Sequence, residues 1–301
     1  MSATAPATPS VLPRSSRPAV LTVENLTVVY EVEHPVTAVK NATISLAPDE
    51  ILGLAGESGC GKTTLAYAIN QLHRPPAHVA SGRVLFHDRD GSQIDLRAIQ
   101  GEELRAFRWA KLSMVFQGAM NALNPVTSIR AQLDDVLKAH KSGLNKKQRR
   151  ARCVDVLQRV GVESRWLNAF PHELSGGMRQ RVMIAMAMLL EPQVMIMDEP
   201  TTALDVVVQR DILREIVRLR DELNFAVIFI THDLPLLLEI SDRIAIMLKG
   251  EIVELDTADR IYQSPQHPYT KKLLASFPSL SGSRGSFIRT GVETSTQEES
   301  A

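Results

Sequence analysis

The sequence predicts an α/β fold with a parallel sheet, an antiparallel β subdomain ahead of it and a helical subdomain inserted into it. Short apolar runs that end at a polar residue alternate with helical patterns, which is typical of a wound parallel sheet. Residues 19–50 precede these runs and alternate apolar with polar side chains, as antiparallel strands do. From 118 to 174 the pattern is mainly helical, and this predicts the insertion.

The apolar runs are short and continuous, as expected of strands buried on both faces. The run "EILGLAGESG" enters a glycine-rich loop, whereas "LSMVFQ", "VMIMDEP" and "AVIFITHD" end at Gln117, at Asp198 with Glu199, and at His232. Ligands of open α/β sheets bind beyond the carboxyl ends of the strands. We therefore expect these endings to meet at one edge of the sheet.

Composition excludes several classes of protein. The 34 basic and 34 acidic residues cancel, so no overall charge points to nucleic acid or to an acidic membrane surface. The longest apolar run, "VMIAMAMLL", is about half of a membrane span, so we do not expect the chain to cross a bilayer by itself. Cys60 and Cys153 lack ligand spacing, which argues against a zinc site or a disulfide framework.

The chain is expected to divide into an ordered domain and two loose ends. Residues 1–19 are rich in Ser, Pro, Ala and Thr and lack the apolar core of a signal peptide, so we predict a disordered leader; a transit peptide is the alternative. Residues 20–260 form the predicted nucleotide-binding domain, including the insertion. Residues 261–301 are predicted to be a C-terminal extension with a disordered tail.

The segment "GESGCGKT" fits the phosphate-loop pattern G-x-x-x-x-G-K-[ST], follows an apolar run and opens a helical one. Glycines let the backbone amides close around phosphates, Lys62 supplies a charge near the outer phosphates, and the Thr63 hydroxyl is a ligand for Mg²⁺. Cys60 is interpreted as a small side chain that the loop tolerates. The residues assigned to nucleotide binding here are Gly56, Glu57, Ser58, Gly59, Cys60, Gly61, Lys62, Thr63 and Thr64.

The other strand endings supply catalytic candidates. Asp198 is expected to join Thr63 in holding Mg²⁺, and Glu199 to orient and deprotonate an attacking water; the alternative is that one of these carboxylates caps a helix. The Gln117 amide is expected to reach the metal or the water, and His232 to bond the terminal phosphate and hold the water.

A second anion site is predicted in "LSGGM", where a Ser-Gly-Gly turn precedes an apolar helix and leaves helix-start amides free. Together with the motifs above, with "TALD" ending at Asp205 and with "THD", this motif makes the chain resemble the ATP-binding subunit of an ATP-binding cassette (ABC) transporter. The resemblance implies a P-loop NTPase fold. The resemblance covers residues 20–278. Met178 departs from the family, which most often has Gln there.

The resemblance implies that two nucleotide-binding domains pair head to tail. Ser175, Gly176 and Gly177 of one domain then cap the γ-phosphate held by the other, and the Asp205 loop runs along the interface. It also implies that Tyr30 stacks on adenine, although the residues alone leave open that Tyr30 belongs to the β-subdomain core. The expected cofactors are ATP and Mg²⁺.

The segment "DRIYQSPQHPYTKKLLASFPSL" and the segment "GAMNALNPVTSI" resemble dipeptide and oligopeptide importer ATPases. This subfamily implies a second ABC ATPase subunit (a different chain or a second copy), two multispanning permease subunits and an extracytoplasmic solute-binding protein. It also implies a peripheral position on the cytoplasmic face of the inner membrane and no nucleic-acid partner. Some relatives carry an iron–sulfur cluster in this tail; here the tail lacks cysteine, so no cluster is expected.

Other functions are weighed against peptide import. The same subfamily moves oligosaccharides, nickel and other small solutes. A soluble ABC ATPase of DNA repair would have a long coiled-coil insertion, and one of translation would have two nucleotide domains in its chain. The sequence shows neither sustained heptads nor a second set of motifs, so both alternatives are disfavoured. A P-loop kinase would have no use for "LSGGM". In the transport hypothesis the helical insertion docks on the permease, and Gln117 is the hinge between ATP and that surface.

Overall fold

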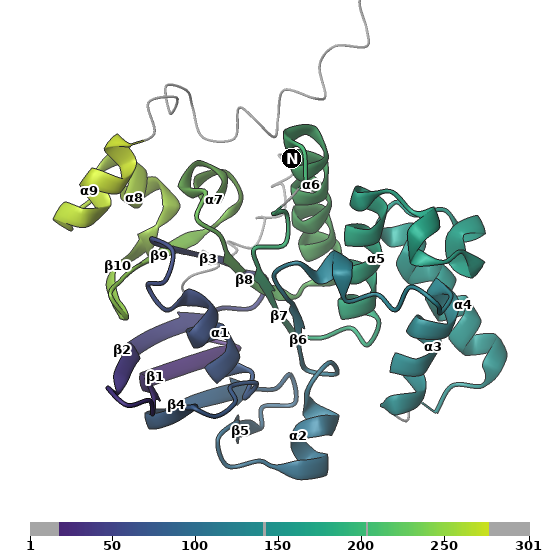
Figure 1. Cartoon of the computed structure of the whole chain (residues 1–301), viewed down its shortest axis with the longest axis horizontal. Coiled ribbons are helices and arrows are strands. Elements are labelled where there is room, and N and C mark those ends of the chain that lie inside the picture. The colour runs from purple at the N-terminus through teal and green to yellow at the C-terminus, as the bar shows by residue number, and fades with distance from the viewer. Residues whose placement is uncertain (1–17, 141–142, 203, 277–301) are drawn as a thin grey trace, which may run out of the picture.

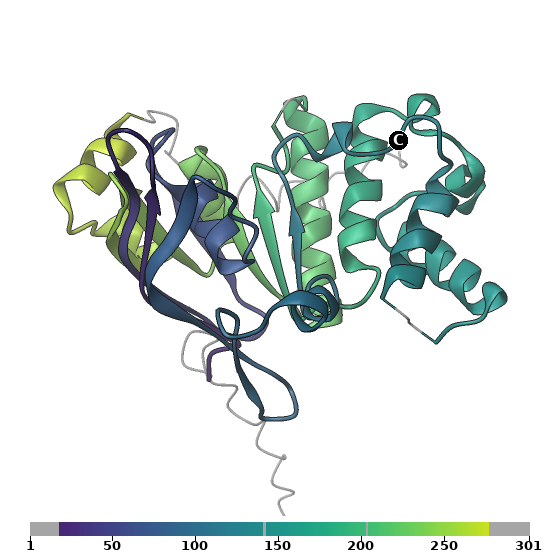
Figure 2. The ribbon, with the colours of Figure 1, turned by 60° about the horizontal axis from the view of Figure 1, so that its bottom comes forward.

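The computed structural model describes residues 18–140, 143–202 and 204–276. The predicted leader lies outside these residues except for its last two positions, and the predicted tail lies outside them after residue 276. The described residues form two β-sheets with helices between and beside them (Figures 1 and 2).

The first sheet is antiparallel, with strand order β2-β1-β4-β5 (Figure 1). Buried positions of β1, all apolar, alternate with partly exposed ones along most of the strand, so one face of this sheet packs on the core. The strands are β1 (Leu21–Tyr30), β2 (Val36–Leu46), β4 (Ala77–His87) and β5 (Gln93–Asp95).

The second sheet has strand order β10-β9-β3-β8-β7-β6, with β9, β3, β8, β7 and β6 parallel and β10 antiparallel at the edge. Every residue of β3, β7 and β8 is buried, which explains the continuous hydrophobicity of these runs. The strands are β3 (Ile51–Ala55), β6 (Leu112–Val115), β7 (Val194–Asp198), β8 (Ala226–Ile230), β9 (Arg243–Leu248) and β10 (Glu251–Thr257). The predicted fold class is confirmed.

Helix α1 (Lys62–Ile69) packs between the two sheets, against β1, β2 and β4 on one side and β7 on the other (Figure 1). Its buried side chains share one core cluster with both sheets. The loop between β3 and α1 therefore lies where the sheets meet. The remaining helices outside the 118–174 region are α2 (Gly101–Phe107), α5 (Gly176–Met188), α6 (Val206–Leu223), α7 (Leu234–Ile240), α8 (Ala258–Gln263) and α9 (Pro268–Ala275).

The 118–174 region is helical and lies on the side of the parallel sheet away from the antiparallel one (Figures 1 and 2). Ser128 and Asn145 cap two of its helices through their side chains, and Asn145 forms a capping box with Gln148. Its elements are η2 (Ala119–Asn121), α3 (Ile129–Ala139), α4 (Lys146–Arg159), η3 (Ser164–Asn168) and η4 (Pro171–Glu173). Among the described helices, none combines the length and the apolar character needed to cross a membrane.

Candidate functional site

A cavity of about 740 Å³ lies beyond the carboxyl ends of β3 and β7, where the antiparallel sheet meets the phosphate loop. Sequence segments far apart in the chain meet there, as the strand endings predicted. The cavity is lined by Tyr30, Val36, Ala38, Ser58, Gly59, Gly61, Lys62, Thr63, Thr64, Gln117, Asp198, Glu199, Thr202 and His232.

The loop before α1 needs glycine at two positions. Gly56 and Gly61 have φ of 149° and 110°, values that side-chain-bearing residues rarely adopt. A Cβ on Gly56 would lie 2.2 Å from the carbonyl oxygen of Met247, and one on Gly61 would lie 2.3 Å from that of Ala38. The loop is therefore pressed against neighbouring backbone and can turn its amides toward the cavity.

Lys62 is held by the loop itself. Its Nζ donates to the carbonyl oxygens of Gly56 (2.7 Å) and Glu57 (2.9 Å), and the residue is only 7% exposed. The Cys60 thiol lies 3.7 Å from the same Nζ and is buried beneath the loop, in agreement with a small packing side chain. These carbonyl and thiol partners carry no opposing charge, so the ammonium group can attract an anion in the cavity.

Thr63 and Asp198 form a pair of oxygen ligands. Thr63 Oγ1 donates to Asp198 Oδ1 at 3.2 Å, while the buried Oδ2 has no hydrogen-bond partner within the described residues. Burial raises the pKa of the Asp198 carboxyl, against the opposing effects of the Thr63 hydrogen bond and the Lys62 charge. A buried carboxylate oxygen without a partner, beside a hydroxyl, suits a hard divalent cation such as Mg²⁺, and Gln117 faces the same cavity.

Glu199 follows β7 in a left-handed backbone conformation, with φ of 47°. Its amide donates to the Ile230 carbonyl (2.9 Å), and its carboxylate lies 2.9 Å from His232 Nδ1 and accepts from Thr202 Oγ1 at 2.7 Å. Burial acts to raise the pKa of Glu199, but the hydrogen bonds of His232 and Thr202 and the charges of His232 and Lys62 outweigh it. The net pKa is lowered, so Glu199 is a carboxylate at neutral pH and can accept a proton.

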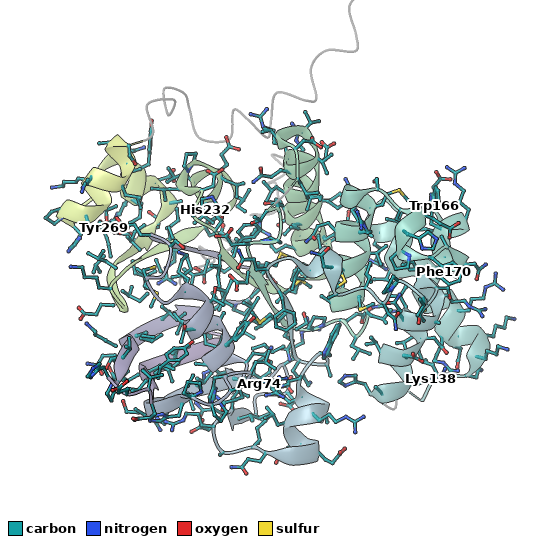
Figure 3. All side chains as sticks on the ribbon, in the orientation of Figure 1. Arg74, Lys138, Trp166, Phe170, His232 and Tyr269 are labelled. Atoms are coloured by element: carbon teal, nitrogen blue, oxygen red, sulfur yellow. The ribbon has the colours of Figure 1, made fainter. Side chains whose placement is uncertain are left out.

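Tyr30 lies at the rim of the cavity, next to the phosphate loop. Its hydroxyl lies 3.2 Å from Thr64 Oγ1, and the half-buried ring lines the cavity together with Val36. Sequence reasoning missed Thr202, whose signal was its place three residues after Glu199 in "DEPTT". His232 is labelled near α7 in Figure 3, well away from Trp166 and Phe170 of the helical region.

The second predicted anion site lies outside this cavity. Ser175 is exposed and caps α5, accepting the Met178 amide at 3.3 Å, and Gly176 and Gly177 form the first turn. Asp205 caps α6 by accepting the Val208 amide at 2.9 Å. Ser175, Gly176, Gly177 and Asp205 do not line the cavity that holds Lys62. The structure thus separates the two predicted anion sites of one chain.

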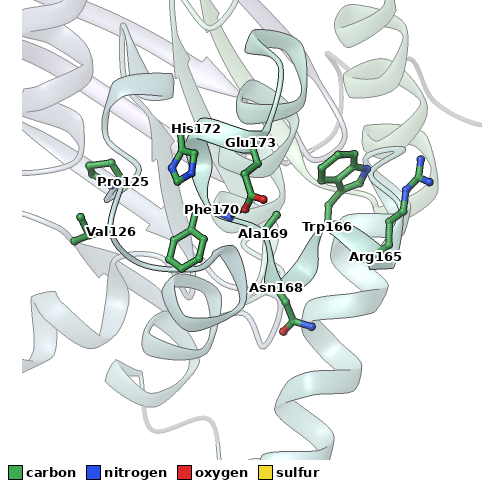
Figure 4. A pocket seen from close by; sticks show the side chains of 9 residues that line it. All are labelled: Pro125, Val126, Arg165, Trp166, Asn168, Ala169, Phe170, His172 and Glu173. Carbon is green, nitrogen blue, oxygen red and sulfur yellow. Dashed lines mark hydrogen bonds between the residues drawn. The ribbon is translucent and has the colours of Figure 1, made fainter.

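A second cavity, of about 760 Å³, lies in the helical region (Figure 4). Its rim is partly apolar, since Val126 is 81% and Phe170 is 38% exposed. The Phe170 ring stacks on His172 with centroids 5.7 Å apart. The lining residues are Pro125, Val126, Arg165, Trp166, Asn168, Ala169, Phe170, His172 and Glu173.

Comparison with known proteins identifies the family. The profile of the family described as ABC transporter matches residues 39–202, which contain the phosphate loop, Asp198 and the Ser175 turn. The chain belongs to the ABC transporter family. A second profile, described as the C-terminal region of oligopeptide/dipeptide transporters, matches residues 253–300. The predicted resemblance to the dipeptide and oligopeptide importer subfamily is confirmed.

Similar ABC proteins include importer subunits. "Glutathione import ATP-binding protein GsiA" of Pectobacterium atrosepticum is 43% identical over 270 residues, which cover 88% of this chain and 43% of GsiA. "Dipeptide transport ATP-binding protein DppD" of Bacillus subtilis is 41% identical over 265 residues, which cover 87% of this chain and 77% of DppD. This chain thus spans less than half the length of the glutathione import relatives.

Solved ABC structures share the fold. The ATP-binding cassette MJ0796, in a dimeric post-hydrolysis state bound to ADP and Pi, matches with a TM-score of 0.68 and 27% identity, covering 79% of this chain and 98% of that one. The cbiO1 protein of Clostridium perfringens, part of the ABC transporter complex cbiONQ, matches with a TM-score of 0.66 and 26% identity, covering 82% and 91%. Membership of this family implies that the chain binds ATP.

Proposed function

We propose that this ABC protein is the ATP-hydrolysing subunit of an importer, and that it couples ATP binding and hydrolysis between two nucleotide-binding domains to the uptake of dipeptides or oligopeptides. The observation that carries the proposal is the separation described above. One cavity is lined by residues of the phosphate loop, Lys62, Asp198 and Glu199, whereas the exposed Ser175 turn does not line it. A second domain would bring its own Ser175 turn to the phosphates.

In the proposed reaction the loop amides and Lys62 bind the phosphates, and Tyr30 stacks on adenine at the rim of the cavity. Thr63, Asp198 and Gln117 would hold Mg²⁺, which neutralises phosphate charge when bound. Glu199 accepts a proton from the attacking water, and His232, hydrogen-bonded to Glu199, orients that water toward the terminal phosphate.

The surface near Asp205 supports pairing of two domains. Val206 and Val207, in the first turn of α6, are 62% and 70% exposed, and large exposed apolar side chains side by side favour an interface. Ser175, Gly176, Gly177 and Asp205 are proposed to contact the ATP of the partner domain, which is either a different chain or a second copy. The Met178 side chain is not needed for this contact, because the amides of the turn supply it.

The cavity of Figure 4 supports a role in transport. We assign it to a cytoplasmic helix of a membrane-spanning permease subunit, because its apolar rim lies in the helical region that begins directly after Gln117. Gln117 then links the nucleotide cavity to this surface. The proposed assembly has two permease subunits and an extracytoplasmic solute-binding protein, with this chain on the cytoplasmic face of the inner membrane. Neither nucleic acid nor an iron–sulfur cluster belongs to it.

The Glu199→Gln variant tests this function. We expect it to bind ATP and to form a stable ATP-dependent dimer with its partner ATPase domain, while the hydrolysis rate falls at least about a hundredfold, the usual range for loss of a general base. Size-exclusion chromatography and phosphate release measure the two effects. Glu102→Gln is the matched control, since Glu102 is an exposed residue of α2 whose carboxylate pairs with Arg105 on the same helix. Undiminished turnover in Glu199→Gln would remove Glu199 as the base.

A further inference from the structure

The C-terminal segment reaches the phosphate loop through Tyr269. The Tyr269 hydroxyl accepts the backbone N–H of Glu57 at 3.2 Å, although the two residues are 212 positions apart. Tyr269 belongs to α9, whose Leu273 and Leu274 pack against the main core cluster. Figure 3 labels Tyr269 on this helix at the side of the parallel sheet. The proposed reaction assigns no role to this contact.

The start of α9 is anchored so that the ring has a defined position. The carboxylate of Glu254 in β10 accepts the backbone N–H of Gln266 at 2.7 Å and that of His267 at 3.1 Å. His267 Nδ1 in turn accepts the Tyr269 amide at 3.1 Å and caps the helix, and Pro268 occupies its first turn. A strand carboxylate, a cap and a proline therefore fix the direction in which Tyr269 leaves the helix.

The Tyr269 hydroxyl accepts a hydrogen bond from Glu57, and the same residue accepts a hydrogen bond from Lys62. The carbonyl oxygen of Glu57 accepts Lys62 Nζ at 2.9 Å and the Cys60 amide at 3.3 Å. Tyr269 itself does not line the nucleotide cavity. Through Glu57 the hydroxyl acts on the loop segment that sets the position of the lysine, and it makes no contact with the cavity.

We propose that Tyr269 is a positioning residue for the nucleotide, through which the C-terminal segment stabilises the ATP-binding conformation of the phosphate loop. This inference rests on the proposed ATP site. Because energetic coupling between two sites is reciprocal, bound ATP must stabilise α9 by the same factor by which the Tyr269 contact tightens ATP binding. The stability of α9 therefore depends on whether ATP is bound at the phosphate loop.

Two neighbouring hydroxyls of α9 give a matched test in the full-length chain. Tyr269→Phe removes the hydroxyl that bonds Glu57, whereas Thr270→Val removes a buried hydroxyl that has no hydrogen-bond partner within the described residues. For Tyr269→Phe we expect the Kd and the KM for ATP to rise about two- to tenfold, the range for one hydrogen bond, with kcat within about twofold of wild type. Thr270→Val should leave the Kd unchanged.

Hydrogen exchange provides a readout that does not depend on turnover. In Tyr269→Phe the Glu57 amide should exchange faster than in wild type and in Thr270→Val. ATP should slow exchange in residues 268–275 of the wild-type chain, and this protection should shrink in Tyr269→Phe. Glu254→Gln, which weakens the anchor of α9 without touching Tyr269, should shift the Kd in the same direction by a smaller factor.

The outcomes separate the two proposals. If the wild-type chain failed to bind ATP, the proposed function would fail, whatever the variants did. If the wild-type chain bound ATP and Tyr269→Phe kept its Kd and its Glu57 exchange rate, the positioning role would be wrong. Equal losses of thermal stability in Tyr269→Phe and Thr270→Val, with both Kd values unchanged, would also overturn it, because Tyr269 would then serve only the packing of α9.

Discussion

Glu199 and His232 come from consecutive strand endings of the parallel sheet, since β7 and β8 are neighbours in register. The left-handed turn at Glu199 lets its amide bond the end of β8 while its carboxylate turns toward the imidazole. Backbone strain of this kind costs about 1–3 kcal/mol and persists only where the surroundings hold it. Here the Ile230 carbonyl, Thr202 and His232 hold it.

His232→Ala should separate orientation of the water from proton transfer. We expect the hydrolysis rate to fall at least about tenfold, because Glu199 remains but the water loses one of its two proposed contacts. The Kd for ATP should change far less, since the loop and Lys62 are untouched. Stopped-flow phosphate release with a parallel binding measurement checks this. His140→Ala, at the end of α3, is the control, and an unchanged rate in His232→Ala would exclude a role in the reaction.

At the scale of elements, one carboxylate ties the antiparallel sheet to the parallel one. Asp88 follows β4, lies 2.7 Å from Lys111 Nζ, and accepts from Gln193 Nε2 at 2.6 Å beside the start of β7. Burial acts to raise the pKa of Asp88, but the hydrogen bonds of Lys111, Gln193 and the Arg89 amide outweigh it and lower the pKa. This group joins the two sheets at the end opposite to the nucleotide cavity.

The pH dependence of stability follows from that lowered pKa. A carboxyl whose pKa is depressed by folding stabilises the fold above its unfolded pKa of about 4 and loses that contribution as pH falls through the lower folded value. Asp88→Asn should therefore be less stable than wild type at pH 7, by about 1–3 kcal/mol, and the difference should shrink below about pH 4. Urea unfolding across this range measures it. Asp135→Asn, an exposed site, controls for the lost charge.

How far the sequence predicts these elements depends on whether the signal is local. Continuous apolar runs located β3, β7 and β8 and their polar endings, because burial on both faces leaves a clear pattern. The run "LSMVFQ" predicted the end of its strand less accurately. Strand β6 ends at Val115, two residues before Gln117, and Phe116 packs edge-on against Tyr67. The contacts of Asp88 and Tyr269 join distant segments through single side chains, so no spacing in the sequence announces them.

At the scale of the whole molecule, the two proposed halves of the ATP site lie on different parts of the chain. The cavity lies where the two sheets meet, and the Ser175 turn begins α5, which packs with the helical region (Figure 2). In the proposed function, a single chain therefore contacts its nucleotide on one side only. The family resemblance predicted this arrangement, but composition and periodicity could not, since they carry no information about a second molecule.

Dilution and Ser175 test the need for a partner domain. The specific hydrolysis rate should fall as the chain and its partner ATPase domain are diluted, because dimers dissociate. Ser175→Trp should lower kcat at least about tenfold at a fixed concentration, with little change in the Kd of the cavity on its own chain. Ser92→Trp, in the turn before β5, is the control. A rate that is indifferent to dilution and to Ser175→Trp would show that one chain suffices.

The close approach of α5 and α6 has a mechanical consequence. A Cβ on Gly177 would lie 2.7 Å from Val208 Cγ1, and Val208 is the residue whose amide Asp205 caps. With no gap between the two helix starts, neither can shift far without displacing the other, since close-packed interiors resist compression. We therefore expect the Ser175 turn and the Asp205 loop to move as one rigid unit. A partner domain that displaced one of them would displace both.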